Sequence, residues 1–162
     1  MRVDKPHETL LYNLADYLDA SGYITLRNLQ LGGSWIHSIH NRPGIADVMC
    51  FKPSYTNMMP RIFEIKVSRS DLMGDIRKEK WRKYIPFCEY VSFAFPRGMA
   101  TSKEIPDDAG IWAWDHDKKS WHCQRRGARH TPTFNDEFWM AALLNQKNII
   151  DRKIKRLERR CR

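Results

Sequence analysis

The sequence predicts a mixed α/β protein in which helices flank a central mixed β-sheet. Helix-like and strand-like segments follow one another in the order helix, strands, helix, strand, hairpin, helix, which is typical of a layered α/β fold. The 162 residues match the length of one domain, and 42% of them are hydrophobic, which suffices for a single buried core. We therefore expect one core over residues 1–134, with a basic helix over 135–162 that packs on the core or extends from it.

The helices are predicted from periodicity and from their ends. Residues 7–20 are expected to be helical because their leucines recur with the helical period and Pro6 stands near the start. A second helix is predicted over 69–85 with Ser70 as its N-cap, and the lysine-rich stretch 78–80 leaves its continuity open. Strands are predicted at 23–29, 34–39, 45–51, 61–67 and 89–95, with a hairpin from 110–115 and 119–124.

Composition points to a polyanionic partner. The chain has 28 Lys and Arg against 19 Asp and Glu, a formal net charge of +9, which favours nucleic acid first and an acidic membrane surface second. No apolar run approaches the ~20 residues of a membrane span, and the start lacks the apolar run of a signal peptide. The four cysteines form no CxxC pair, so free thiols are expected rather than a zinc site. We expect a cytoplasmic protein that binds neither a membrane nor a small-molecule cofactor.

The strand predicted at 61–67 carries charge where a buried strand would be apolar. Side chains of a strand alternate between its faces, so Phe63 and Ile65 share one face while Glu64 and Lys66 share the other. Buried strand positions are usually occupied by residues such as Val or Leu. The carboxylate and the ammonium are therefore candidates for chemistry, although a solvated ion-pair patch, contributing about 0–1 kcal/mol, is the alternative.

Asp47 interrupts the otherwise apolar strand at 45–51, and aspartate is depleted in strand interiors. A short loop joins this strand to the next, so the two are expected to pair antiparallel with Asp47 beside Glu64. Two carboxylates and a backbone carbonyl suit Mg²⁺, a hard cation that prefers oxygen ligands. A divalent ion would lower the pKa of a water and offset charge on a phosphate under attack. The alternative is that Asp47 is an unrelated turn or salt-bridge residue.

The arrangement Asp47…Glu64-x-Lys66 resembles the signature of the PD-(D/E)XK nuclease superfamily, although Ala46 stands where the family name has Pro. Residues 42–96 also resemble the MmcB-like DNA repair branch and related phage and bacterial proteins. The further features shared with that branch are Ser68, Asp71, Asp75, Lys80-Trp81, Tyr84 and the strand ending at Pro96. The resemblance implies a restriction-endonuclease-like fold. It also implies that the protein acts in a bacterial or phage-infected bacterial cell.

The resemblance also implies roles for individual residues. Asp47, Glu64 and the carbonyl of Ile65 would hold Mg²⁺, with Mn²⁺ as a substitute, and Lys66 would be catalytic. In several members a glutamate of the first helix reaches the metal, which makes Glu8 a candidate ligand, although it could instead complement the helix dipole. Lys80 is expected to be a catalytic residue or a phosphate contact. The candidates for nucleic-acid binding are Arg69, Lys80, Lys83, Arg152, Lys153, Lys155 and Arg156.

The leading hypothesis is a metal-dependent DNA endonuclease or repair-type nuclease that hydrolyses phosphodiester bonds. Two alternatives stay open: a nuclease-fold module that binds DNA without efficient catalysis, and a phage or mobile-element protein that acts through other interactions. The basic tail could also be a solvated, frayed end. The sequence leaves open whether the substrate is a duplex, single strand, flap, junction or RNA, and whether the protein is a monomer or a homodimer.

Overall fold

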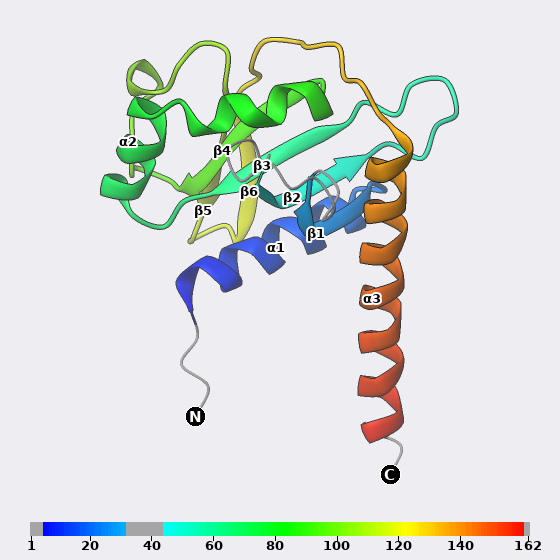
Figure 1. Ribbon diagram of the computed structural model, residues 1–162. Coiled ribbons are helices and arrows are strands. Elements are labelled where there is room, and N and C mark those ends of the chain that lie inside the picture. The colour runs from blue at the N-terminus through cyan, green and yellow to red at the C-terminus, as the bar shows by residue number, and fades with distance from the viewer. Residues whose placement is uncertain (1–4, 32–43, 161–162) are drawn as a thin grey trace.

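The computed structural model describes residues 5–31 and 44–160 as a six-stranded mixed sheet flanked by helices, which confirms the expected fold class (Figure 1). The predicted strand at 34–39 lies outside the described residues. The strands are β1 (Ile24–Gln30), β2 (Ile45–Phe51), β3 (Arg61–Ile65), β4 (Tyr90–Pro96), β5 (Gly110–Asp115) and β6 (Ser120–Arg125). The helices are α1 (Pro6–Ala20), α2 (Arg69–Arg77), the 3₁₀ helices η1 (Lys80–Phe87) and η2 (Ser102–Glu104), and α3 (Asp136–Arg160).

The strands lie in the sheet in chain order. β1, β2 and β3 form antiparallel pairs, β3, β4 and β5 form parallel pairs, and β6 returns antiparallel to β5. A parallel pair needs a crossover connection, and α2 with η1 provides the one between β3 and β4. This connection sets a helical layer directly above the strand that carries the predicted catalytic residues.

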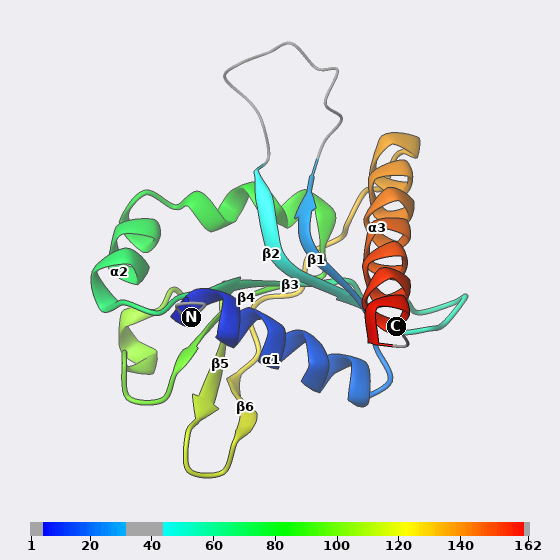
Figure 2. The same ribbon diagram turned by 90° about the horizontal axis from the view of Figure 1, so that it is seen from below.

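The sheet separates two buried apolar layers, because the side chains of each strand alternate between its faces. On one face Phe63 and Ile65 pack against α1, and on the other Ile62 packs against η1 and α2. Figures 1 and 2 show α1 crossing one face, α2 and η1 covering the other, and α3 standing beside β1. No helix among the described residues has the length and apolar character needed to cross a bilayer.

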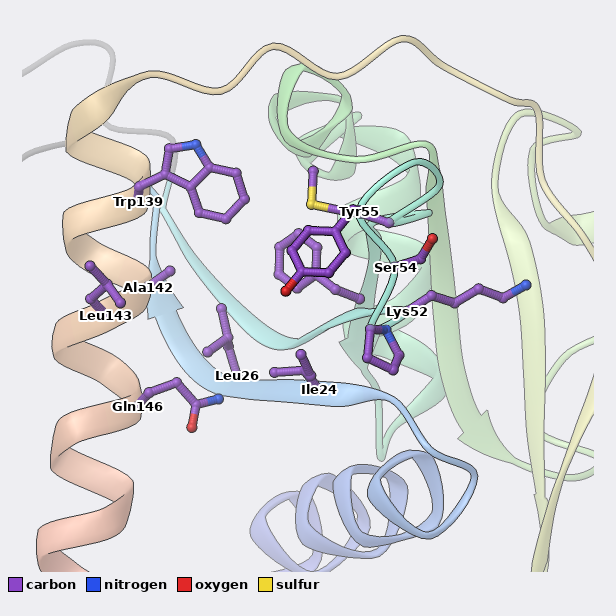
Figure 3. Close-up of a pocket in the computed structure, with 12 residues that line it drawn as sticks. Ile24, Leu26, Lys52, Ser54, Tyr55, Trp139, Ala142, Leu143 and Gln146 are labelled. Carbon is purple, nitrogen blue, oxygen red and sulfur yellow. The ribbon is translucent and has the colours of Figure 1, made fainter.

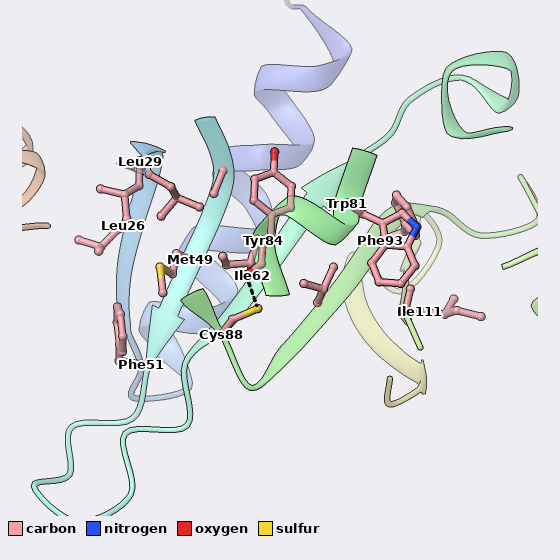
Figure 4. Packing of buried hydrophobic residues seen from close by; sticks show 14 of the residues in the cluster. Leu26, Leu29, Met49, Phe51, Ile62, Trp81, Tyr84, Cys88, Phe93 and Ile111 are labelled. Carbon is pink, nitrogen blue, oxygen red and sulfur yellow. Dashed lines mark hydrogen bonds between the residues drawn. The ribbon is translucent and has the colours of Figure 1, made fainter. Parts of the chain in front are cut away.

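The layer above the sheet is built from large side chains of η1. Trp81 and Tyr84 are buried in the core, where Tyr84 lies over Ile62 and Trp81 lies beside Phe93 (Figure 4). The Sγ of Cys88 donates a hydrogen bond of 3.3 Å to the carbonyl of Tyr84 and closes the last turn of η1. Cys50, Cys88 and Cys123 are free thiols.

The structure settles the continuity of the second helix and corrects its N-cap. The segment 69–85 is broken within the lysine-rich stretch 78–80, since α2 ends at Arg77 and Glu79 takes a left-handed conformation (φ 48°) before η1 begins. The N-cap is Ser68 rather than Ser70, because the Ser68 hydroxyl accepts a hydrogen bond of 3.2 Å from the backbone N–H of Asp71. The turn at Glu79 lets η1 change direction and bring its aromatic side chains down onto the sheet.

The cap assignment predicts a difference between two neighbouring serines. Ser68→Ala removes the acceptor for a helix N-terminal N–H and should lower the free energy of unfolding by about 1 kcal/mol. Ser70→Ala, the matched control inside the first turn, should change it by less than about 0.5 kcal/mol. Urea unfolding followed by circular dichroism measures both values, and equal losses for the two variants would contradict the assignment.

Candidate active site

The site begins where β2 and β3 stop pairing. Toward the start of β2 and the end of β3, the last paired residues are Val48 and Phe63. Asp47 stands one position beyond them, opposite Glu64. The Asp47 Oδ2 atom accepts a hydrogen bond of 2.8 Å from the backbone N–H of Ile65. A side-chain oxygen thus takes the place of a main-chain carbonyl of β2. We call this place, formed by Asp47, Glu64 and Ile65, the strand fork.

The strand on the other side of β2 is also irregular at this point. The pairing of β1 with β2 passes from Arg27 to Leu29, and the intervening Asn28 has a left-handed backbone with φ 51°. Asn and Asp tolerate this conformation better than most residues. Asp47 is therefore flanked by a kink in β1 and by the end of the ladder with β3, which explains how an aspartate is accommodated inside the sheet.

Glu64 is a buried carboxylate with incomplete hydrogen bonding. Its side chain is 16% exposed, and its Oε1 accepts a hydrogen bond of 3.3 Å from the Nζ of Lys66. Its Oε2 is buried and has no hydrogen-bond partner within the part of the chain that the structure describes. Burial and then the charge of Asp47 raise the pKa of Glu64, against the opposing influence of Lys66 and the Tyr84 hydroxyl. The ionised carboxylate is thus held at a cost.

Lys66 is a buried ammonium surrounded by carboxylates. Its side chain is only 6% exposed, and its Nζ lies 2.5 Å from Asp75 Oδ2 and 3.4 Å from Asp71 Oδ2. Burial lowers the pKa of Lys66, but the hydrogen bond from Lys66 to Asp75 and the charges of Glu64, Asp75 and Asp71 together raise it above its ordinary value. Lys66 consequently stays protonated at neutral pH.

Asp75 links the two lysines that were predicted to be catalytic. Its Oδ2 accepts from Lys66, and its Oδ1 lies 3.0 Å from the Nζ of Lys80, whose side chain is half exposed. Burial raises the pKa of Asp75, but the hydrogen bonds from the two lysines prevail and lower it. The sequence left the role of Asp75 open, and only the fold of α2 over the end of β3 shows that it holds Lys66.

The residue of α1 that reaches the fork is His7 rather than Glu8. The Nε2 atom of His7 lies 3.3 Å from Asp47 Oδ2. The Glu8 side chain is 60% exposed and lies 3.8 Å from the Nζ of Lys5. The expected ligand role of Glu8 therefore does not fit this geometry. The apolar stripe of the helix could not indicate which of two adjacent polar residues faces the sheet at its first turn.

The donor set of the fork fits a divalent cation. Two carboxylates meet there, and the unpartnered Oε2 of Glu64 lacks the positive charge or hydrogen bond that a buried carboxylate oxygen requires. Residues 5–31 and 44–160 hold no group of three or more His, Cys, Asp or Glu side chains arranged for a metal. A cation at the fork would therefore have two carboxylates, a main-chain carbonyl and water as ligands, a combination that suits Mg²⁺.

The remaining basic candidates lie outside this network. Lys83 has its Nζ 4.9 Å from the centre of the Tyr84 ring, next to Gly44. Arg69 is bound to Glu104 and donates a hydrogen bond of 3.1 Å to the carbonyl of Met99. The candidates on the distal part of α3 are Arg152 and Lys155, which are exposed, and Lys153 and Arg156, whose side chains lie outside the described residues.

Comparisons with known proteins bear on the fold alone. No family model and no curated protein sequence matches this chain. A solved structure of a protein of unknown function from Silicibacter pomeroyi is similar with a TM-score of 0.66 and 17% sequence identity, over 96% of this chain and 94% of that one. This likeness shows that the fold of the chain has a solved counterpart.

The raised pKa of Glu64 predicts a stability gain on its neutralisation. Because the folded chain binds the Glu64 proton more tightly than the unfolded chain, the free energy of unfolding falls as pH rises through the interval between the two pKa values. Glu64→Gln keeps an oxygen that accepts from Lys66 and removes the charge, so it should raise the melting temperature at pH 7 without divalent ions. The gain should vanish below the unfolded-state pKa of about 4.3. Asp117→Asn, on an exposed turn, should show no such gain.

The Asp75 bridge predicts unequal costs for two aspartates that surround the same lysine. Asp75→Asn should lower the free energy of unfolding by about 2–3 kcal/mol, because the buried Lys66 ammonium keeps Glu64 but loses its shortest partner. Asp71→Asn should cost less than about 1 kcal/mol, since that side chain is 61% exposed. Because the pKa of Asp75 is lowered in the folded state, its contribution is present above the unfolded-state pKa and is lost in acid. Chemical denaturation at pH 7 compares the two variants.

Proposed function

We propose that this protein is a metal-dependent nuclease of the PD-(D/E)XK type that hydrolyses phosphodiester bonds in DNA. The single observation that carries the proposal is the strand fork, where the carboxylates of Asp47 and Glu64 meet beside the buried ammonium of Lys66. Holding two carboxylates and an ammonium at one end of a sheet is costly, because each buried charge must be desolvated. Perturbed titratable groups of this kind gather at functional sites.

The residues that would hold the cation are Asp47, Glu64 and the carbonyl of Ile65, with Mg²⁺ as the expected ion and Mn²⁺ as a substitute. When bound, the ion would lower the pKa of a water molecule and offset negative charge on the phosphate. The chain prepares for this by placing Glu64 beside the Lys66 ammonium and by anchoring Asp47 to the Ile65 N–H. The arrangement fixes the two carboxylates before any ion arrives.

Lys66 would act as a charged hydrogen-bond donor rather than as a general base. Its raised pKa keeps it protonated at neutral pH, so it has no lone pair with which to accept a proton. It would donate to the scissile phosphate or orient the attacking water, as an electrostatic stabiliser of the transition state. Asp75 serves as its positioning residue, because it fixes the Nζ near Glu64 and also holds Lys80 at the edge of the same site.

The basic composition supports DNA as the substrate. A net charge of +9 raises affinity for a polyanion, and Lys80 and Lys83 lie on η1, on the same side of the sheet as Lys66. The exposed Arg152 and Lys155 of α3 would add contacts to the phosphate backbone away from the fork. A role in DNA repair or phage DNA metabolism in the cytoplasm is the setting that the resemblance to the MmcB-like branch suggests.

The proposal predicts loss of cleavage in three variants that keep the fold. Asp47→Asn, Glu64→Gln and Lys66→Met should each reduce metal-dependent cleavage about 100-fold or more, because each removes a group that contacts the ion or the phosphate. Labelled duplex, single-stranded, flap and four-way-junction DNA are incubated with Mg²⁺, with Mn²⁺ and with EDTA. Asp117→Asn, at an exposed turn, is the matched carboxylate control and should cleave as the wild type does.

Metal binding is measured separately from cleavage. Mg²⁺ at about 100 times its dissociation constant should stabilise the wild type by about 2.7 kcal/mol, whereas Glu64→Gln should gain little. The wild type could instead bind DNA in a salt-dependent way, show no stabilisation by Mg²⁺ or Mn²⁺ and cut no substrate. That result would contradict the proposal and support a DNA-binding module without catalysis. The absence of a third ligating side chain among the described residues is the observation that favours this second candidate.

A further inference from the structure

The helix α3 has two halves with different surroundings. Its first half packs on the sheet, where Phe138 and Ala142 are buried. There Asn145 Nδ2 donates 2.9 Å to the carbonyl of Arg27, and Gln146 Nε2 donates 2.8 Å to the carbonyl of Thr25. Figures 1 and 2 show the second half running past the sheet and away from α1. Among the described residues, the last turns of this 25-residue helix therefore extend beyond the sheet that supports its first half.

One exposed side of α3 carries a regular apolar stripe. Its apolar members are between 49% and 65% exposed. They recur with the alternating three- and four-residue spacing of a coiled-coil seam, in which a and d are the core positions of each heptad. We call this set the α3 stripe; in a, d order it comprises Met140, Leu143, Lys147, Ile150, Ile154 and Leu157.

The stripe joins an apolar groove at its upper end. A cavity of about 490 Å³ lies between α3, β1 and the loop after β2, and Leu143 belongs to both the groove and the stripe. Figure 3 shows Trp139 and Leu143 on α3 and Ile24 on β1 around this groove. Exposed apolar side chains thus run from the groove to Leu157 near the end of α3, interrupted by Lys147. Exposed apolar side chains that gather in this way mark an interaction site.

The end of α3 would gain stability from a partner. A stretch of fewer than ~12–15 residues is marginal as an isolated helix in water, and helix stability comes mainly from packing an apolar face. The last a and d positions of the α3 stripe, Ile154 and Leu157, are the β-branched and leucine residues that favour two-stranded coils, whereas d is Ile150 in the heptad before. A single lysine at an a position (Lys147) sets register and oligomer state at some cost in stability.

The charges beside the stripe select the direction of the partner. In the two heptads that begin at Lys147 and Ile154, the sequence places acidic residues at the e positions (Asp151, Glu158) and basic residues at the g positions (Lys153, Arg160). In the heptad that begins at Met140, the same positions hold the uncharged Leu144 and Gln146. In a parallel pair, g of one helix meets e of the next heptad on the other, so residue 153 meets residue 158 with opposite charge. In an antiparallel pair, e meets e and g meets g, so like charges face each other. We propose that this chain forms a parallel homodimer through the α3 stripe.

An acidic membrane surface is the competing occupant of a basic amphipathic helix. The flank formed by Asp151 and Glu158 argues against it, because these carboxylates lie beside the apolar stripe and would face anionic head groups. The dimer leaves the opposite face of α3 open, where the exposed Arg152, Lys155 and Arg159 lie. A parallel pair also places both sheets at the same end of the coil.

The first test measures the mass in solution by size exclusion with light scattering. The wild type should have twice the chain mass of 19.3 kDa, and Ile154→Glu, which puts a charge into the seam, should have the single-chain mass. Asn148→Glu adds the same charge at an exposed position off the seam and should stay dimeric. Circular dichroism checks that both variants keep the helix and strand content of the wild type. A monomeric wild type at the highest soluble concentration would overturn the proposal.

The second test separates parallel from antiparallel pairing. Lys153→Glu and Glu158→Lys should each raise the dimer dissociation constant roughly 2- to 30-fold, the effect of two exposed ion pairs, and the double variant should restore it. Tighter association of the single variants would show an antiparallel dimer instead. Sedimentation with vesicles of phosphatidylcholine and phosphatidylserine tests whether the α3 stripe binds an acidic membrane instead. A wild type that stays monomeric and binds these vesicles would show that the stripe binds a membrane and not a second copy.

Discussion

The hydrogen bond from the Ile65 N–H to Asp47 Oδ2 is the interaction on which the site depends. A main-chain donor at the end of a strand needs a partner, and here a side chain supplies it. Because the bond fixes Asp47 against β3, the carboxylate stands opposite Glu64 without a continued ladder to hold it there. The same bond leaves β2 and β3 free to separate beyond this point. The fork is therefore both a way to end the ladder and a way to bring two carboxylates together.

The positive charge of Lys66 offsets the negative charges of the carboxylates around it. The Lys66 ammonium pairs with Glu64 and Asp75 at once, and Asp75 in turn pairs with the half-exposed Lys80, so that charges of opposite sign alternate from β3 to η1. A buried charge is tolerated when it is paired and hydrogen-bonded. Glu64 is the exception in this network, since one of its oxygens is orphaned and its pKa is raised. The fold thus accepts a local instability at the position where a cation would relieve it.

Periodicity in the sequence predicted the strand and the charged residues of the site. It could not decide which of two neighbouring polar residues faces the site or caps the helix. The β2 bounds and the grouping of Glu64 with Lys66 followed from alternation, and polar residues inside apolar strands marked Asp47. Ser68 rather than Ser70 and His7 rather than Glu8 are choices between near neighbours, which tertiary packing decides. The sequence left a break at 78–80 open, and the structure shows that a left-handed Glu79 makes it. The role of Asp75 required knowing where α2 lies over the sheet.

The two features of α3 do not compete, because helical geometry separates them. Residues of the α3 stripe recur at a and d, whereas Arg152 and Lys155 occupy positions f and b, on the outer side of a two-stranded coil. In the sequence, the many basic residues of α3 predict DNA binding. The heptad pattern is harder to recognise, because Lys147 interrupts its apolar positions. Pairing of the stripes would bring two basic faces onto one rigid stalk and two sheets to its upper end. Contacts to a phosphate backbone would then come from both copies, so dimerisation and DNA binding would strengthen each other by linkage.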